Sequence, residues 1–280
     1  MLNYWFYSHA TWEVATVVCS AMVILPLIGL FFFHRLVPWE VREPDTKLVG
    51  LSYALCGSVY AVMLAFVAVG TYETMEKTDS VASEEANSLG GLAFDSAGLP
   101  AGLAVRLRSD IDKYIDIVTG SEWPNQRAYR MEERNYEEGW AQLRQVGLDV
   151  ANFEPETQGQ ATVKAELEHV INELFSARRA RLLAANAHLP NAVWQMLVFG
   201  LGLVAIYIFL FGPHNYRMHM AVTGLTMLSV GLVFTLIIAL DYPFRGELSV
   251  SDEAYVVVKE VSDRAFSQAI PGAAAHEKKK

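Results

Sequence analysis

The C-terminal half of the chain contains two long apolar runs. Arg217 is the only Lys, Arg, Asp or Glu between Arg181 and Asp241, and it separates apolar residues 191–212 from apolar residues 218–240. About 20 residues, at a helical rise of about 1.5 Å per residue, cross a hydrocarbon core of about 30 Å. The pattern therefore predicts two membrane-spanning helices that are joined as a hairpin.

The N-terminal half repeats this pattern. Residues 14–34 and residues 48–72 contain no Lys, Arg, Asp or Glu, and the short segment between them carries Arg35, Arg42 and Lys47. We therefore expect a second hairpin there. Together the four runs predict an all-α integral membrane protein with four transmembrane helices, arranged as two hairpins in a lipid bilayer.

A polar, acidic segment separates the two apolar pairs. Residues 73–190 carry a charge balance of −8, so almost all of the formal net charge of −9 lies there. An acidic segment without a basic stripe argues against nucleic acid as a partner. We expect an N-terminal interfacial segment with the first hairpin (1–72), a helical extramembrane module (73–190), the second hairpin (191–240) and a C-terminal extramembrane segment (241–280).

Helical periodicity continues through the polar segment. No Gly or Pro occurs between Tyr72 and Gly90, so the second span is expected to leave the bilayer as one continuous helix. Val81, Ala82, Glu85, Ala86 and Leu89 would share one packed face of it. Amphipathic patterns predict further helices over 101–119, 126–146, 159–187 and 251–268, a loop over 147–158, and a disordered tail over 270–280.

The N-terminus is rich in aromatic side chains, namely Tyr4, Trp5, Phe6, Tyr7 and Trp12. Tyr and Trp are enriched where a membrane meets water. We therefore expect this segment to lie at the membrane interface, in preference to a disordered tail.

One face of the second span combines small, hydroxylated and aromatic residues at helical spacing. Small residues let membrane helices approach closely, and hydroxyl groups bond across helices or face water. Helix packing is the more common explanation of such a face, and a water-lined pore is the alternative. Our candidates for pore-lining residues are Tyr53, Gly57, Tyr60, Leu64, Val67 and Thr71.

Catalytic motifs are missing from the sequence. It contains no Gly-rich phosphate loop, no His-Glu-x-x-His, no Cys-x-x-Cys and no nucleophile elbow. Cys19 and Cys56 lie in apolar runs, where cysteine behaves as a small hydrophobe. The histidines are scattered, and for His214 and His219, near a span end, we prefer an interfacial role to haem or metal ligation. We expect no enzymatic activity, no cofactor and no metal.

The cores of the four spans lack ionisable Asp, Glu, Lys and Arg. Ion-coupled transporters and proton channels normally keep such a group at membrane depth. Two classes of function remain. In the first, identical subunits ring a pore, and the lack of acidic side chains in the spans suits anions. In the second, the chain is an accessory subunit whose module docks a partner. A stator-like proton-channel subunit also places a helical segment between its second and third spans, but a partner would have to supply the acid.

Basic residues flank the spans on both sides. The first loop holds three basic residues against none before the first span, which by the positive-inside rule places that loop in the cytoplasm and the module outside. Lys77, Arg178, Arg179, Arg181, Arg245 and Lys259 lie at the opposite span ends and nearly cancel this bias. The rule therefore assigns no side to the module.

Two motifs follow the second and fourth spans. They are Glu84-Glu85-Ala86-Asn87 and Asp241-Tyr242-Pro243-Phe244-Arg245-Gly246, and Leu99-Pro100 and the approach from Arg178 to Leu189-Pro190 complete the pattern. Over most of residues 45–255 the chain resembles the bestrophin-like family of bacterial membrane proteins of unknown function. That family is likened to bestrophins, which are pentameric anion channels with four spans per subunit. The chain lacks a recognisable version of the acidic calcium clasp of animal bestrophins, so the resemblance does not imply calcium gating.

The residue pattern and the resemblance together favour a homo-oligomeric, anion-conducting channel of the bacterial inner membrane. The alternative is a non-catalytic accessory or scaffold subunit of a larger membrane complex. Glu84, Glu85 and Asn87 are candidates to line a vestibule or, as we prefer, to clamp a neighbouring helix. Asp241 and Arg245, at a membrane edge, are expected to pair with each other or to contact the module.

Overall fold

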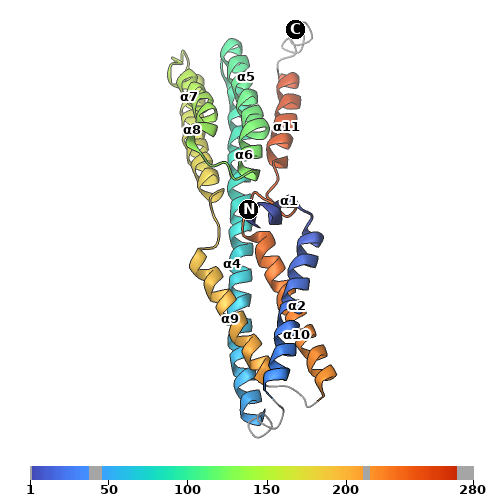
Figure 1. Ribbon diagram of the computed structural model, residues 1–280. Helices are drawn as coiled ribbons and strands as arrows, with labels where there is room; N and C mark the ends of the chain where they lie inside the picture. Colours follow the sequence, from blue (N-terminus) through green and yellow to red (C-terminus); the bar gives the residue numbers. More distant parts are fainter. Residues whose placement is uncertain (1, 38–45, 211–214, 270–280) are drawn as a thin grey trace. The chain divides into compact units, whose positions relative to one another are not determined.

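A computed structural model describes residues 2–37, 46–210 and 215–269, and all regular structure in these ranges is helical (Figure 1). Within these ranges four helices are long and apolar enough to cross a membrane: α2 (Thr11–Leu36), α4 (Thr46–Asp95), α9 (Asn191–Leu210) and α10 (Tyr216–Leu240). The all-helical fold with four membrane helices is therefore confirmed. Arg42, His214 and the expected tail lie outside the described residues.

The chain divides into two compact units. The first comprises Met1–Met75, Ala187–Tyr242 and Gly246–Leu248, and the second comprises Glu76–Asn186, Pro243–Arg245 and Ser249–Lys280. The first unit contains α2, α9, α10 and the apolar part of α4. Helix α4 continues without a break into the second unit, as the absence of Gly and Pro after Tyr72 predicts.

In the first unit, α2 packs antiparallel to α10. The close approach requires small residues, because a Cβ atom at Gly231 of α10 would lie only 3.2 Å from the Cα atom of Cys19 of α2. This packing joins the first helix of one predicted hairpin to the second helix of the other. Packing within each predicted hairpin stays a prediction.

Helix α4 packs against α9 in the same unit. The ring of Tyr60 lies on Gly200, and its hydroxyl donates a hydrogen bond of 3.0 Å to the carbonyl oxygen of Leu197. Phe209 of α9 in turn covers Gly29 of α2. The apolar core of this unit consists of Val14, Val18, Tyr60, Leu64, Leu197, Val204, Ile208, Met227, Phe234 and Ile237.

The aromatic N-terminal segment forms the short helix α1 (Leu2–Ser8). Trp5 and Phe6 pack against the core of the first unit. The hydroxyl of Tyr7 donates a hydrogen bond of 3.0 Å to the carbonyl oxygen of Ile238, near the C-terminus of α10. These contacts hold α1 against the end of α10, and its position at a lipid surface stays a prediction.

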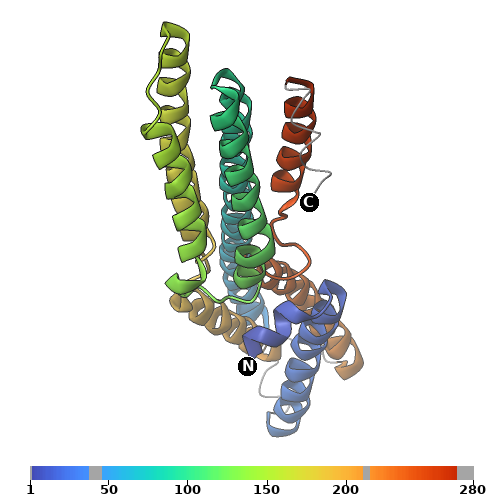
Figure 2. The ribbon, with the colours of Figure 1, turned by 90° about the horizontal axis from the view of Figure 1, so that it is seen from above.

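The second unit gathers the remaining helices around the polar part of α4. Seen from above, α7 and α8 lie on one side of α4 and α5, and α11 lies on the other (Figure 2). Four members of the predicted face are buried there, namely Ala82, Glu85, Ala86 and Leu89, whereas Val81 is only half-buried. The helices are α5 (Ala101–Ile117), α6 (Trp123–Arg127), α7 (Glu137–Ala151), α8 (Gln158–Ala184) and α11 (Glu253–Ala269), with 3-10 turns at Ser96–Gly98 and Glu133–Asn135.

The predicted helix over 126–146 is wrong. Gly120 does not end the preceding helix, because a π-helical turn (Val118–Glu122) carries α5 directly into α6. Helix formation stops where Tyr129 adopts a φ of 54°, in the left-handed region. Helix α7 then runs into the predicted loop over 147–158, because the buried spacing of Leu143 and Val146 continues to Val150.

The contact between Tyr60 and Gly200 can be tested with two neighbouring glycines of α9. A Cβ atom at Gly200 would lie 2.5 Å from the Tyr60 ring, whereas one at Gly202 would meet nothing within 4 Å. We expect Gly200→Ala to lower the free energy of unfolding by about 1–3 kcal/mol, because overpacking displaces the ring. Gly202→Ala should not lower it, because alanine is favoured over glycine inside a helix by up to about 1 kcal/mol. Equal thermal unfolding midpoints for the two variants in detergent would contradict the packing described.

Candidate functional site

The structure divides the predicted pore-lining stripe on α4. Tyr60, Leu64 and Thr71 are buried within the chain. Thr71 donates its hydroxyl to the carbonyl oxygen of Ala68, 2.9 Å away in the same helix, so this hydroxyl has a partner inside the chain. Tyr53 and Val67 pack partly against the core of the first unit, while open space adjoins Gly57. Helix packing accounts for the three buried members, and a pore-lining role for the stripe stays a prediction.

A different face of α4 is exposed along both its apolar and its polar part. Its members recur every three or four residues, which is the spacing of one helical face. Carboxylates follow the apolar members along the helix, and Lys77 is the positively charged residue next to Glu76. We call this the exposed face of α4: Val62, Phe66, Val69, Glu73, Glu76, Ser80, Glu84 and Asn87.

Glu84 and Asn87 also line a groove between α4 and α8 in the second unit. Its volume is about 680 Å³, and none of the described residues that line it is Lys or Arg. Both side chains are therefore accessible to water, as a vestibule role requires. The remaining lining residues are Ser88, His169, Asn172, Glu173, Ser176, Ala177 and Ala180.

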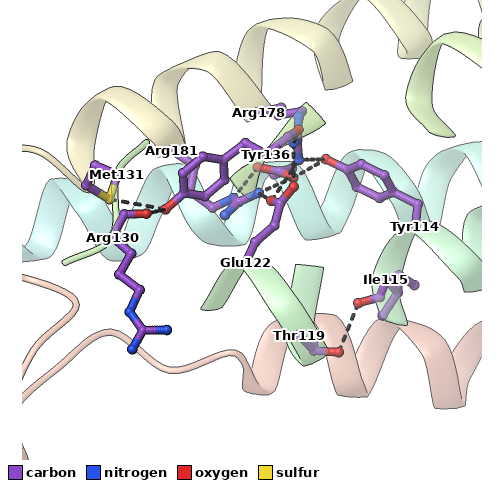
Figure 3. A network of polar contacts seen from close by, with 10 residues as sticks. Tyr114, Ile115, Thr119, Glu122, Arg130, Met131, Tyr136, Arg178 and Arg181 are labelled. Atoms are coloured by element: carbon purple, nitrogen blue, oxygen red, sulfur yellow. Dashed lines mark hydrogen bonds and ion pairs between the residues drawn. The ribbon is translucent and has the colours of Figure 1, made fainter. Parts of the chain in front are cut away.

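Glu85 has a different environment, because it lies in a buried ion cluster. The cluster joins Glu85 of α4, Glu122 of the π turn, and Arg178 and Arg181 of α8, whose side chains are all fully buried. Arg181 Nε lies 2.6 Å from Glu85 Oε2, and Arg181 Nη2 lies 2.8 Å from Glu122 Oε2. Arg178 Nη2 lies 2.5 Å from Glu122 Oε1 (Figure 3). Glu85 thus contacts α5 and α8 within the chain, and its role as a clamp stays a prediction.

Aromatic residues complete the surroundings of the cluster. Tyr114 of α5 donates its hydroxyl to Glu85 Oε1 at 2.6 Å and accepts a hydrogen bond of 2.9 Å from Arg178 Nη1. The guanidinium group of Arg178 also lies over the Trp140 ring, 4.7 Å from its centroid. Gly139 of α7 allows this packing, because a Cβ atom there would collide with the Glu122 carboxylate and the Arg178 guanidinium.

The cluster balances two carboxylates against two guanidinium groups. Burial alone lowers the pKa of Arg181, but the Glu85 carboxylate is foremost among the groups that raise it, and the pKa ends well above its ordinary value. Burial raises the pKa of Tyr114, and the charge of Glu85 adds to this effect. Burial likewise raises the pKa of Tyr136 to about 12. The arginines therefore stay charged and the tyrosines stay protonated near neutral pH.

Glu85 was singled out from the sequence, and two further charged members of the cluster could have been found there. Arg178 and Arg181 continue the three-and-four spacing of Leu167, Ile171 and Leu174, so an arginine pair occupies the apolar face of α8. Leu182, the apolar residue next to Arg181, is only half-buried. Glu122 gives no comparable signal in the sequence, because the direction of its side chain depends on a π-helical turn.

Asp241 joins the ends of two membrane helices. Its Oδ1 atom accepts a hydrogen bond of 2.6 Å from the backbone N–H of Leu189, and its Oδ2 atom accepts one of 3.2 Å from Trp194 Nε1. Burial raises the pKa of Asp241, although these hydrogen bonds act in the opposite direction. In the second unit, Arg245 lies over the ring of Tyr129, and its role in fixing the end of the fourth span stays a prediction. A direct pair between Asp241 and Arg245 stays a prediction.

Removal of one arginine tests the buried ion cluster. We expect Arg178→Met to lower the free energy of unfolding by about 3–5 kcal/mol, because it leaves carboxylate charge buried without its partner. Arg179→Met is the matched control, since Arg179 is the exposed neighbour on α8, and it should change stability by less than about 0.5 kcal/mol. Chemical denaturation of the full chain in detergent, followed by circular dichroism, measures both. Equal stabilities would show that the cluster does not hold the module together.

Comparison with known proteins matches this architecture to one family. The family model of the bestrophin-like domain matches residues 20–255. Crystal structures of two point mutants of a bacterial bestrophin homologue from Klebsiella pneumoniae are similar to the chain, with TM-scores of 0.64 and 0.63 at 13% and 14% sequence identity. Each similarity covers 90% of this chain and 98% of the other.

A crystal structure described as that of a membrane protein gives a TM-score of 0.61 at 13% identity, over 91% of this chain and 97% of the other. Identities this low show a shared fold alone. Among curated proteins, none matches the sequence. The family match, in contrast, extends from α2 to the start of α11 and includes every member of the buried ion cluster. The chain is therefore an integral membrane protein that belongs to the bestrophin-like family.

Proposed function

We propose that several copies of this chain assemble around an ion-conducting pore that follows the exposed face of α4. The observation that carries the proposal is the continuity of this face within one 50-residue helix. Val62, Phe66 and Val69 form an apolar stretch at membrane level, and Glu73 and Glu76 follow directly. Apolar constrictions and rings of carboxylates are two means by which channels control ion passage.

The interior of the first unit supports a pore between copies of the chain, in preference to a pore within one copy. Its core consists of apolar side chains such as Leu197, Met227 and Phe234, which are almost completely buried. Such a core offers an ion no polar path through a single subunit. The exposed face of α4 continues from the membrane segment into accessible polar side chains. We therefore propose that this face lines the pore of a homo-oligomer in the bacterial inner membrane. In this proposal the chain is a channel and not an enzyme.

Two features favour opposite ions. The resemblance to bestrophins favours anions, and the membrane segments lack acidic side chains between their ends. The carboxylates of Glu73, Glu76 and Glu84 favour cations, since a ring of copies would repeat each negative charge around the axis. A single flux experiment separates the two, because it compares chloride with potassium on the same protein.

Purified protein in liposomes should conduct one of these ions above the rate of empty liposomes. We expect Glu73→Gln combined with Glu76→Gln to shift the ratio of potassium to chloride flux towards chloride, because these changes remove negative charge from the path. Glu168→Gln, an exposed carboxylate of α8 outside the exposed face of α4, is the matched control and should leave the ratio unchanged.

The outcomes decide between the classes of function. Chloride flux above potassium flux supports anion conduction, and the reverse makes the acidic part of α4 the selectivity element. No flux of either ion, together with co-purification of a stable larger complex, would contradict the channel and support an accessory subunit. Native mass spectrometry that shows only monomers in mild detergent would contradict the homo-oligomer.

A further inference from the structure

Three buried side chains of the second unit carry polar atoms that the chain itself does not pair. Trp123 and Gln126 of α6 are each 1% exposed, and Arg181 of α8 is fully buried. Within the described part of the chain, no hydrogen bond reaches the Nε1 atom of Trp123, the Nε2 and Oε1 atoms of Gln126, or the Nη1 atom of Arg181. Since buried polar groups in folded proteins are almost always hydrogen-bonded, this group of atoms indicates a bound ligand.

The three side chains adjoin one another. Trp123 begins α6, and Gln126 follows three residues later, on the same face of the helix. The guanidinium carbon of Arg181 lies over the Trp123 ring, 5.6 Å from its centroid. The rings of Phe244 and Tyr255 stand edge-on to the same indole, with centroids 5.0 and 5.4 Å away. Aromatic side chains therefore surround the indole whose N–H group has no protein acceptor.

The chemistry of these atoms restricts the ligand. The indole, the guanidinium group and the amide nitrogen donate only, which disfavours a cation. An anion could accept from these three donors, but it could not donate to the Oε1 atom of Gln126. The carboxylates of the neighbouring buried ion cluster already balance its guanidinium groups, so no positive charge is left for an anion. Water both donates and accepts, and a buried water typically makes about three such hydrogen bonds.

We propose that Trp123, Gln126 and Arg181 form a binding site for buried water that links α6 to α8. The water accepts from the Trp123 indole and from Arg181 Nη1–H, and it donates to the amide oxygen of Gln126. It thereby completes the surroundings of Arg181, whose Nε and Nη2 atoms bind Glu85 and Glu122. The site lies inside the second unit, and it does not depend on ion conduction.

Gln126→Met tests the site through the sign of its effect on stability, because methionine has a similar length but no amide. If water binds the amide, the change removes a hydrogen bond and should raise the unfolding constant of the full chain about fivefold in detergent. An amide that binds nothing would be relieved by methionine, so an unchanged or lower unfolding constant would overturn the proposal. Gln145→Met, at an exposed glutamine of α7, is the matched control and should stay close to the wild type.

Water-edited solid-state NMR of the full chain in liposomes, with nitrogen-15 tryptophan, detects the water itself. Trp123→Phe identifies the Trp123 indole signal, which should receive polarisation from water in the wild type and about twofold more slowly in Gln126→Met, since fewer hydrogen bonds hold the water. Trp194 is the internal control, because its indole binds Asp241, and its signal should not respond to Gln126→Met.

The wild-type spectrum decides even if Gln126→Met does not fold. No transfer from water to the Trp123 indole would contradict the proposal, as would equal transfer in the wild type and in Gln126→Met. A Trp123 signal that shifts with chloride concentration would identify the ligand as an anion and would overturn the assignment to water.

Discussion

Charges that are buried away from water must be neutralised by other charges, and this requirement organises the second unit around α4. Glu85 and Glu122 lie where no solvent reaches them, so Arg178 and Arg181 have to meet them at hydrogen-bonding distance. The four side chains come from α4, from a π-helical turn and from α8, so their pairing fixes the positions of three segments that are distant in the sequence. Tyr114 extends the same network to α5.

The first unit follows the opposite rule, since charge is confined to the ends of its helices. Close contacts replace ion pairs there, with Gly231 against Cys19 and Gly200 beneath Tyr60. Polar contacts also occur at the helix ends, where Asp241 binds the backbone N–H of Leu189 before α9, and His34 of α2 lies 3.1 Å from His219 of α10. Helix α4 belongs to both units, which makes its exposed face the structural link between membrane and module in the function that we propose.

Much of this architecture follows from patterns in the sequence. Uncharged runs of sufficient length predict four membrane helices because lipid allows few other structures. The missing helix breaker after Tyr72 predicts the length of α4. The predicted pore-lining stripe shows the limit of such patterns, since periodicity places Tyr60 and Leu64 on one face but does not say whether α9 or water covers it. Glu122 and the π turn were missed, because neither residue type nor spacing marks a change of helical geometry.

The accessibility of α4 in the assembled protein tests the proposed role of its exposed face most directly. Single cysteines can be placed along α4 after Cys19 and Cys56 have been replaced by serine, and labelled with a charged, water-soluble thiol reagent in liposomes. We expect labelling at positions 62, 66 and 69, and protection at positions 60 and 64, which are buried against the core of the first unit. Labelling at positions 60 and 64 with protection at 62, 66 and 69 would place water on the other side of the helix and contradict the account.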